Sequence, residues 1–235
     1  MRGRWKKLLR TALLFLSLSA IILSGIPCFA AKGIENPCVL VIDPGHGGLD
    51  GGAVSVDGDT ESRLNLEIAL RLRDLCRLCG VRCLLTRAEE SLPYPPDLTS
   101  VHAKKVWDQQ RRVELVHSQE NPVLISIHQN YYPDTRPRGT QVLYARSPES
   151  ETLGRITHEN LICALCPENR RVAAPASDSI YLMKQVTCPG ILVECGFLSN
   201  PDETHKLKSE RYQKQLAAVL AASFLQYTNA IESRQ

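Results

Sequence analysis

Two histidines and a glutamate follow short runs of branched apolar residues in this 235-residue chain. They are His46, His128 and Glu194, and each apolar run predicts a strand that is buried on both faces. The carboxyl ends of parallel strands lie at one edge of a sheet, which is where binding sites form in open α/β sheets. We therefore expect these three side chains to gather at one edge, together with Glu61, which begins a predicted helix.

Two histidines and one carboxylate are a ligand set typical of catalytic zinc sites, in which a fourth position is left for water. Zinc lowers the pKa of that water from about 15.7 to about 7, which provides a nucleophile at neutral pH. A second carboxylate must then take the proton of the water and pass it to the leaving nitrogen. The spacing does not decide which of Glu61 and Glu194 is the ligand and which is the base.

Each of these residues also has a simpler interpretation. A single histidine at a strand end is more often a hydrogen-bonded loop residue, but two histidines at equivalent strand ends favour a shared site. Glu61 could be a charge that the helix macrodipole favours at a helix start. Asp43 could also be a ligand, but an aspartate before Pro44 and Gly45 is usually part of a turn. The other histidines fall on polar helix faces or in loops, and we expect them to be solvated: His102, His117, His158 and His205.

The first thirty residues predict an export segment. Five basic residues and no acidic residue precede an apolar stretch over 12–26, and Cys28-Phe29-Ala30 offers small residues to a signal peptidase. The segment is long for a signal and short for a membrane span, so an uncleaved anchor is an alternative. We expect a protein that is exported across the cytoplasmic membrane and contacts the membrane only through this segment.

The charge balance gives no support for nucleic-acid binding. The chain has 28 basic and 25 acidic residues, and the export segment holds five of the basic ones. The remainder has 23 basic and 25 acidic residues, with no basic run that contains interleaved aromatic residues. We therefore expect no nucleic-acid partner.

Nine cysteines are many for an exported chain. Two Cys-x-x-Cys pairs, Cys76/Cys79 and Cys163/Cys166, have the spacing of a zinc ribbon. Both pairs lie within helical patterns, where they replace apolar residues. We favour the interpretation that the cysteines are small core residues, and disulfides are the alternative.

Residues 38–228 predict one α/β domain, with no linker or internal repeat that would divide it. The expected architecture is a mostly parallel, twisted sheet of about six strands with helices on both faces. Strands are predicted at 39–42, 82–86, 122–127, 139–145, 180–183 and 190–193, and helices at 61–79, 102–117, 149–166 and 210–227.

Four motifs resemble the signatures of the zinc-dependent N-acetylmuramoyl-L-alanine amidase family (amidase type 3). The resemblance implies that His46, Glu61 and His128 bind one zinc ion and that Glu194 is the catalytic general base. The reaction it implies is cleavage of the amide between the lactyl group of muramic acid and L-alanine of the peptidoglycan stem peptide. The motifs are Asp43-Pro44-Gly45-His46-Gly47-Gly48, Glu61-x-x-x-Asn65-Leu66, Ser126-Ile127-His128-x-Asn130 and Val193-Glu194-x-Gly196-Phe197-Leu198-Ser199-Asn200.

The small size, the lack of a wall-binding repeat, Leu85-Thr86-Arg87 and the run 180–183 look most like the germination-specific branch of this family. That branch is similar to enzymes that strip stem peptides in the spore cortex, ahead of muramic δ-lactam formation. The resemblance implies a location in the cell wall or the spore intermembrane space. It leaves open whether an activating protein partner is needed.

Substrate contacts are expected from Asn130, Arg87, Arg170 and Arg171. Arginine pairs bidentately with carboxylates such as those of the stem peptide, although a loop arginine is often simply solvated. Cys195 follows Glu194 directly, and strand alternation points it to the opposite face of the sheet. We interpret Cys195 as a core residue and not as a nucleophile.

Two other functions fit parts of the pattern. A zinc carboxypeptidase or endopeptidase of peptidoglycan would keep the metal ligands but cut within the peptide. A carboxypeptidase needs a fixed cation beside the zinc, and no arginine directly neighbours His46, Glu61 or His128 in the sequence. A catalytically inactive wall-binding module would have no physical need for both the ligand set and Glu194. The amidase is therefore the function that we expect.

Overall fold

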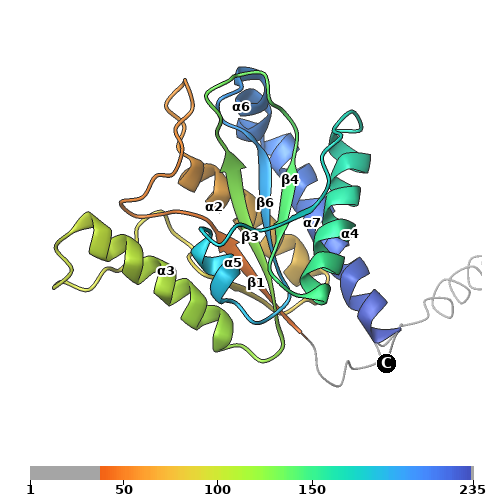
Figure 1. The fold of residues 1–235 in the computed structure, drawn as a ribbon, viewed down its shortest axis with the longest axis horizontal. Coiled ribbons are helices and arrows are strands. Elements are labelled where there is room, and N and C mark those ends of the chain that lie inside the picture. Colours follow the sequence, from red (N-terminus) through yellow and green to blue (C-terminus); the bar gives the residue numbers. More distant parts are fainter. Residues whose placement is uncertain (1–37, 234–235) are drawn as a thin grey trace, which may run out of the picture. The chain divides into compact units, whose positions relative to one another are not determined.

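The centre of the computed structural model, which describes residues 38–233, is a six-stranded sheet with the strand order β2-β1-β3-β6-β4-β5 (Figure 1). β2 and β3 pair parallel with β1, and β6 pairs parallel with β3. β4 runs antiparallel to β6 and parallel to β5. The predicted fold class is confirmed. The strands are β1 (Val39–Pro44), β2 (Cys83–Leu85), β3 (Pro122–Asn130), β4 (Gln141–Tyr144), β5 (Ala174–Pro175) and β6 (Gly190–Phe197).

The central strands are runs of branched apolar residues because helices cover both faces of the sheet. Side chains alternate between the two faces. In β1, Leu40 and Ile42 pack in the larger core and Val41 packs in the smaller core, and all three are fully buried. In β3, Ile127 packs in the larger core, so alternation places His128 on the opposite face.

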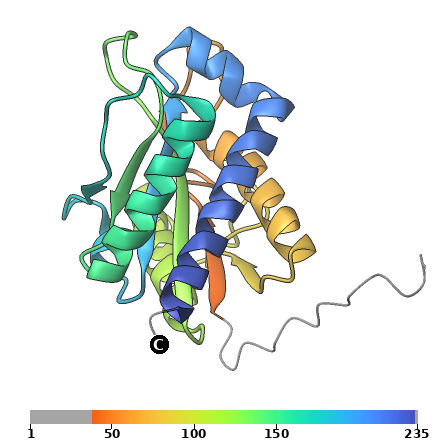
Figure 2. The same cartoon turned by 90° about the vertical axis from the view of Figure 1, so that its right-hand side faces the viewer.

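Three long helices cover the face of the larger core (Figures 1 and 2). In the first of them, Leu64, Ile68 and Leu72 recur every four residues and form one fully buried stripe. These helices are α2 (Glu61–Leu78), α4 (Pro148–Leu165) and α7 (Glu210–Glu232), and α6 (Pro201–Lys208) precedes α7 at the carboxyl end of β6.

Two helices, α3 (Val101–His117) and α5 (Tyr181–Gln185), cover the other face. The strand predicted at 180–183 is wrong, because these residues enter α5. Val186 follows Leu182 by four residues and Met183 by three, and all three pack in the smaller core. That spacing is typical of a helix. Residues 180–183 taken alone are four adjacent apolar residues, which is why they were predicted as a strand. The sheet still has six strands, because β5 takes the place of the strand that was wrongly predicted.

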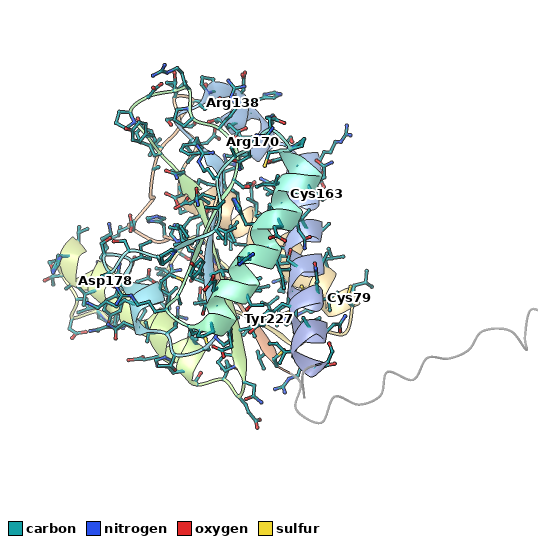
Figure 3. All side chains as sticks on the ribbon, turned by 45° about the vertical axis from the view of Figure 1, so that its right-hand side comes forward. Cys79, Arg138, Cys163, Arg170, Asp178 and Tyr227 are labelled. Carbon is teal, nitrogen blue, oxygen red and sulfur yellow. The ribbon has the colours of Figure 1, made fainter. Side chains whose placement is uncertain are left out.

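The cysteines divide between the core and the surface. All eight cysteines from Cys38 onward are free thiols. Cys76 and Cys166 are buried, as the core interpretation predicts, but Cys79 and Cys163 are exposed (Figure 3). Each Cys-x-x-Cys pair therefore has one buried and one exposed member.

The predicted export segment, residues 1–30, lies outside the described residues. Within residues 38–233, none of the helices combines the length and the apolar character that crossing a bilayer requires.

The stripe of α2 predicts a contrast between two leucines of one helix. Leu72→Ala should lower the free energy of unfolding by about 2–5 kcal/mol, because it removes fully buried methyl groups and leaves a cavity. Leu78→Ala is the matched control, since Leu78 is 85% exposed, and its effect should stay within about 0.5 kcal/mol. Urea unfolding measures both, and equal effects would contradict this packing.

Candidate metal centre

Three separate elements bring His46, Glu61 and His128 together. His46 lies in the loop after β1, Glu61 is the first residue of α2, and His128 lies in β3. Nε2 of His46 is 3.3 Å from Oε2 of Glu61, and Nδ1 of His128 is 3.0 Å from Oε1 of the same carboxylate. One donor atom from each residue lies within 4.8 Å of the others, so the three side chains can share one metal ion.

Two glycines make this close approach possible. A Cβ atom at Gly45 would lie 2.2 Å from Nε2 of His128. A Cβ atom at Gly52 would lie 2.5 Å from Oε2 of Glu61 and 2.8 Å from Cδ2 of His46. Any other residue at either position would push the candidate ligands apart, so the backbone here is shaped around them.

The ring of His46 lies between two carboxylates, because its Nδ1 is 3.1 Å from Oδ2 of Asp50 while Nε2 faces Glu61. Burial alone would lower the pKa of His46, but the hydrogen bonds to Asp50 and Glu61 raise that pKa to about 9. The site therefore favours positive charge. Its two imidazoles and one carboxylate fit a divalent cation such as zinc, and Asp50 fixes the orientation of the His46 ring.

Glu194 lies beside the candidate ligands. It is the register partner of His128 across β3 and β6, and neighbouring strands lie about 4.8 Å apart. Burial raises the pKa of Glu194 to about 7, and its Oε2 atom is buried without a hydrogen-bond partner among the described residues. Native proteins rarely leave a buried polar atom unpaired unless it has a function, so this oxygen is available for proton transfer.

β3 and β6 extend further than predicted, to Asn130 and Phe197. His128 and Glu194 therefore lie within strands and not in the loops after them. Asn130 closes β3, where its backbone carbonyl accepts a hydrogen bond from the N–H of Leu198. It is half-buried at the same edge of the sheet as the candidate metal ligands.

Arg87 has a different environment from the one expected. It is 4% exposed, and its guanidinium donates to the backbone carbonyls of Gly45, His46 and Ser62 at 2.7–3.0 Å. These carbonyls occupy the donors that would bind a substrate carboxylate. Arg87 therefore supports the loop around His46 instead.

Arg170 and Arg171 do not contact the metal centre and line a separate pocket. His158, which we expected to be solvated, is 3% exposed, and its Nε2 is 2.9 Å from the backbone carbonyl of Arg171. Cys195 is fully buried in the larger core, which confirms that it lies on the face opposite to Glu194.

A buried ion pair that the sequence patterns did not predict holds the backbone around His46. Asp43 is 1% exposed and Arg112 is 5% exposed, and their side chains form an ion pair. Arg112 also donates to the backbone carbonyls of Pro44 and His46. His46 has a φ of 59°, which costs a residue other than glycine about 1–3 kcal/mol. The ion pair stabilises that conformation.

One signal in the sequence could have indicated this ion pair. Asp108 and Arg112 are four residues apart in α3, whose apolar stripe is weak, and both are buried together with Val116. Nε of Arg112 donates to Oδ2 of Asp108 at 3.0 Å. An acidic and a basic residue on the inward stripe of a helix therefore indicated a buried partner elsewhere in the chain.

The carboxylate of Asp43 is held in its charged form. Burial alone would raise the pKa of Asp43, but the guanidinium of Arg112 and the hydroxyls of Ser126 and Thr86 lower it to about 2. Because this value is below the ordinary 3.8, the charged form stabilises the folded protein above about pH 4. That contribution is lost as the pH falls towards 2.

We expect Asp43→Asn to lower the free energy of unfolding at pH 7 by about 1.5–3 kcal/mol, because buried Arg112 loses a charge-assisted hydrogen bond and keeps only the carboxylate of Asp108. The variant should also lose less stability than the wild type between pH 5 and pH 2. Urea unfolding in the presence of a chelator measures both effects without a contribution from metal. Asp74→Asn is the control, since Asp74 is 65% exposed, and equal effects of the two substitutions would contradict the role of Asp43.

This chain is similar over most of its length to a family of known proteins. Residues 40–225 match the family described as N-acetylmuramoyl-L-alanine amidase. The chain is 35% identical over 190 residues to the germination-specific N-acetylmuramoyl-L-alanine amidase of Bacillus subtilis strain 168. The match covers 80% of this chain and 79% of that relative.

Solved structures give the same result. The CwlD amidase from Clostridioides difficile, in complex with the GerS lipoprotein, has a TM-score of 0.78 and 32% sequence identity, and the match covers 82% of this chain and 99% of that one. An N-acetylmuramoyl-L-alanine amidase from Clostridium difficile 630 has a TM-score of 0.71 and 26% identity, over 83% and 98% of the two chains. The resemblance seen in the sequence motifs is confirmed, and this chain belongs to the N-acetylmuramoyl-L-alanine amidase family.

Proposed function

We propose that this protein is a zinc-dependent peptidoglycan amidase that uses Glu194 as its general base. The observation that carries the proposal is the unpaired, buried carboxylate oxygen of Glu194 beside His128. The side chains of His46, Glu61 and His128 would hold the ion. When bound, zinc lowers the pKa of a water in the site towards 7 and polarises the carbonyl under attack.

Glu194 would take a proton from the attacking water and give it to the nitrogen of the leaving L-alanine. Burial raises the pKa of Glu194 above that of an ordinary carboxylate, which suits both steps because a proton carrier works best when its pKa is near the working pH. Asp50 would keep the ring of His46 directed at the ion. Asn130 lies where it could contact the glycan or the peptide, and Arg87 has no part in the proposal because its donors are occupied.

We place the activity in spore-cortex maturation, where removal of stem peptides precedes formation of muramic δ-lactam. The supporting relative is the Bacillus subtilis amidase, which is described as germination-specific. Residues 1–30 would direct export or provide an anchor, and residues 38–228 would be the catalytic domain in the cell wall or the spore intermembrane space. Since the CwlD amidase was solved with a lipoprotein, a protein partner is proposed for this chain as well.

Glu194→Gln should retain the metal and lower turnover by about 10²- to 10⁴-fold, because an amide cannot accept the proton of the water. Zinc content measured by atomic emission should stay near one ion per chain. Glu159→Gln is the matched control, since Glu159 is exposed on α4, and it should keep full activity. If Glu194→Gln lost zinc while Glu61→Gln kept it, the roles of the two glutamates would be reversed.

Chelation should abolish activity on purified peptidoglycan, and added zinc should restore it. Mass spectrometry should then find peptide-free muramic acid chains together with intact stem peptides that begin with L-alanine. Shortened peptides that remain attached to the glycan would instead indicate a carboxypeptidase or endopeptidase.

A further inference from the structure

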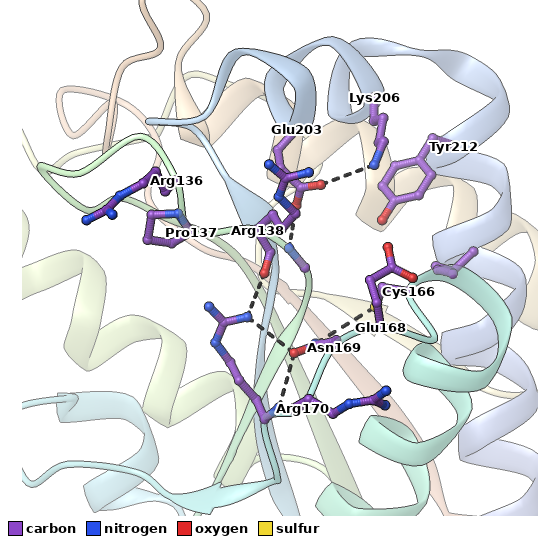
Figure 4. Close-up of a pocket in the computed structure, with 13 residues that line it drawn as sticks. Arg136, Pro137, Arg138, Cys166, Glu168, Asn169, Arg170, Glu203, Lys206 and Tyr212 are labelled. Carbon is purple, nitrogen blue, oxygen red and sulfur yellow. Dashed lines mark hydrogen bonds and ion pairs between the residues drawn. The ribbon is translucent and has the colours of Figure 1, made fainter.

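A cavity of about 590 Å³ opens between the β3–β4 connection, the end of α4 and the start of α6 (Figure 4). A volume of this size is typical of small-molecule sites. Five basic side chains and two acidic ones line it. We call this space the cation pocket, after its basic side chains Arg136, Arg138, Arg170, Arg171 and Lys206.

Three of the five cations have no acidic partner. Arg136 pairs with Asp134, and Lys206 pairs with Glu203. Arg138, Arg170 and Arg171 form no ion pair within residues 38–233, although Glu168 also lines the pocket. Figure 3 shows Arg138 and Arg170 on neighbouring parts of the surface. The pocket therefore has an excess of positive charge that an anionic ligand would neutralise.

The loop after α4, which carries Arg170 and Arg171, is held in place by hydrogen bonds. Nη1 of Arg171 donates to the backbone carbonyl of Arg138 at 2.6 Å and to Oδ1 of Asn169 at 3.3 Å. The Arg171 guanidinium lies 5.0 Å from the ring centroid of Phe197. The backbone carbonyl of Arg171 is 2.9 Å from the buried ring of His158. A guanidinium has five N–H donors, so Arg171 keeps donors for a ligand after these contacts.

The same loop passes close to the catalytic carboxylate. Gln141 is the register partner of Glu194 across β4 and β6, and its side-chain amide donates to the carbonyl of Val172 at 2.8 Å. Phe197, under the Arg171 guanidinium, is three residues beyond Glu194, which corresponds to about 10 Å along a strand. An extended peptide of four residues spans about 13 Å. A peptide with its first amide at the metal centre can therefore reach the cation pocket.

We propose that the cation pocket binds free carboxylates of the stem peptide, with Arg138, Arg170 and Arg171 as the binding residues. The guanidinium group of arginine can form two parallel hydrogen bonds to one carboxylate, and the stem peptide carries carboxylates beyond its first residue, L-alanine. This proposal rests on the proposed amidase function and assigns the site that recognises the peptide.

Binding of a product tests the pocket without turnover. The probe is the tripeptide L-alanyl-γ-D-glutamyl-diaminopimelate, titrated calorimetrically into the zinc-loaded protein. Arg138→Gln/Arg170→Gln should raise its Kd about tenfold or more, because it removes charge-assisted hydrogen bonds. Arg155→Gln/Arg211→Gln is the matched control, since both residues are exposed and lie outside the pocket, and it should bind like the wild type.

Two further ligands identify the chemistry that is recognised. The tripeptide with its carboxyl groups amidated should bind at least tenfold more weakly to the wild type and show no difference between the variants. Tripeptide binding that is equal in both double variants would overturn the proposal. So would a preference of the pocket for glycerol phosphate oligomers over the tripeptide. Circular dichroism melting establishes that each variant is folded.

Kinetics separate this inference from the amidase function itself. Arg138→Gln/Arg170→Gln should raise KM for N-acetylmuramoyl tripeptide with little change in kcat. It should leave cleavage of N-acetylmuramoyl-L-alanine amide, which lacks the distal carboxylates, unchanged. If this double variant cleaved both substrates with the same kcat and KM as the wild type, the proposed role of the pocket would be wrong, but the proposed amidase function would not be affected. Failure of the wild type to cleave either substrate would overturn the amidase, whatever the tripeptide titration gives.

Discussion

The buried guanidinium groups of Arg87 and Arg112 hold the loop that contains His46. The geometry of the candidate metal centre depends on them. Arg87 and Arg112 both donate to the carbonyl of His46, and the carboxylates of Asp43 and Asp108 pair with Arg112. The loop contains a histidine at a positive φ, next to glycines that admit no Cβ atom. Such a backbone is unfavourable by itself. The buried charges supply directional bonds that apolar packing could not provide, because carbonyl groups require donors.

The site combines this constrained loop with regular structure. Glu61 begins α2, and His128 and Glu194 belong to adjacent parallel strands. Register between β3 and β6 is determined by apolar side chains such as Ile127 and Val193, which pack in the larger core. A one-residue slip of either strand would turn its functional side chain into that core. The packing of the sheet thus sets the distance between His128 and Glu194, whereas hydrogen bonds set the position of His46.

The fold and the central residues of the site could be predicted from the sequence because they depend on local patterns. Apolar runs marked the strands, and His46 and His128 stood out as polar residues beside them. Interactions between distant residues could not be predicted in this way. The Asp43–Arg112 pair joins positions 69 residues apart, and Asp43 had a sufficient local explanation as a turn residue. Arg87 looked accessible for the same reason, since the chain alone does not show that carbonyls from another loop surround it.

The antiparallel direction of β4 has a consequence for how this protein can diversify. β3 and β4 are joined by the ten residues 131–140, and both ends of this connection lie at the edge of the sheet that holds the candidate metal centre. The connection is tied down by Asn200, which donates to the carbonyls of Thr135 and Pro137, and by Glu203, which accepts the N–H of Gly139. Insertions or deletions in residues 131–140 would change the surface between the candidate metal centre and the cation pocket without moving any strand. Changes in this one connection could therefore alter substrate preference while His46, Glu61, His128 and Glu194 stay the same.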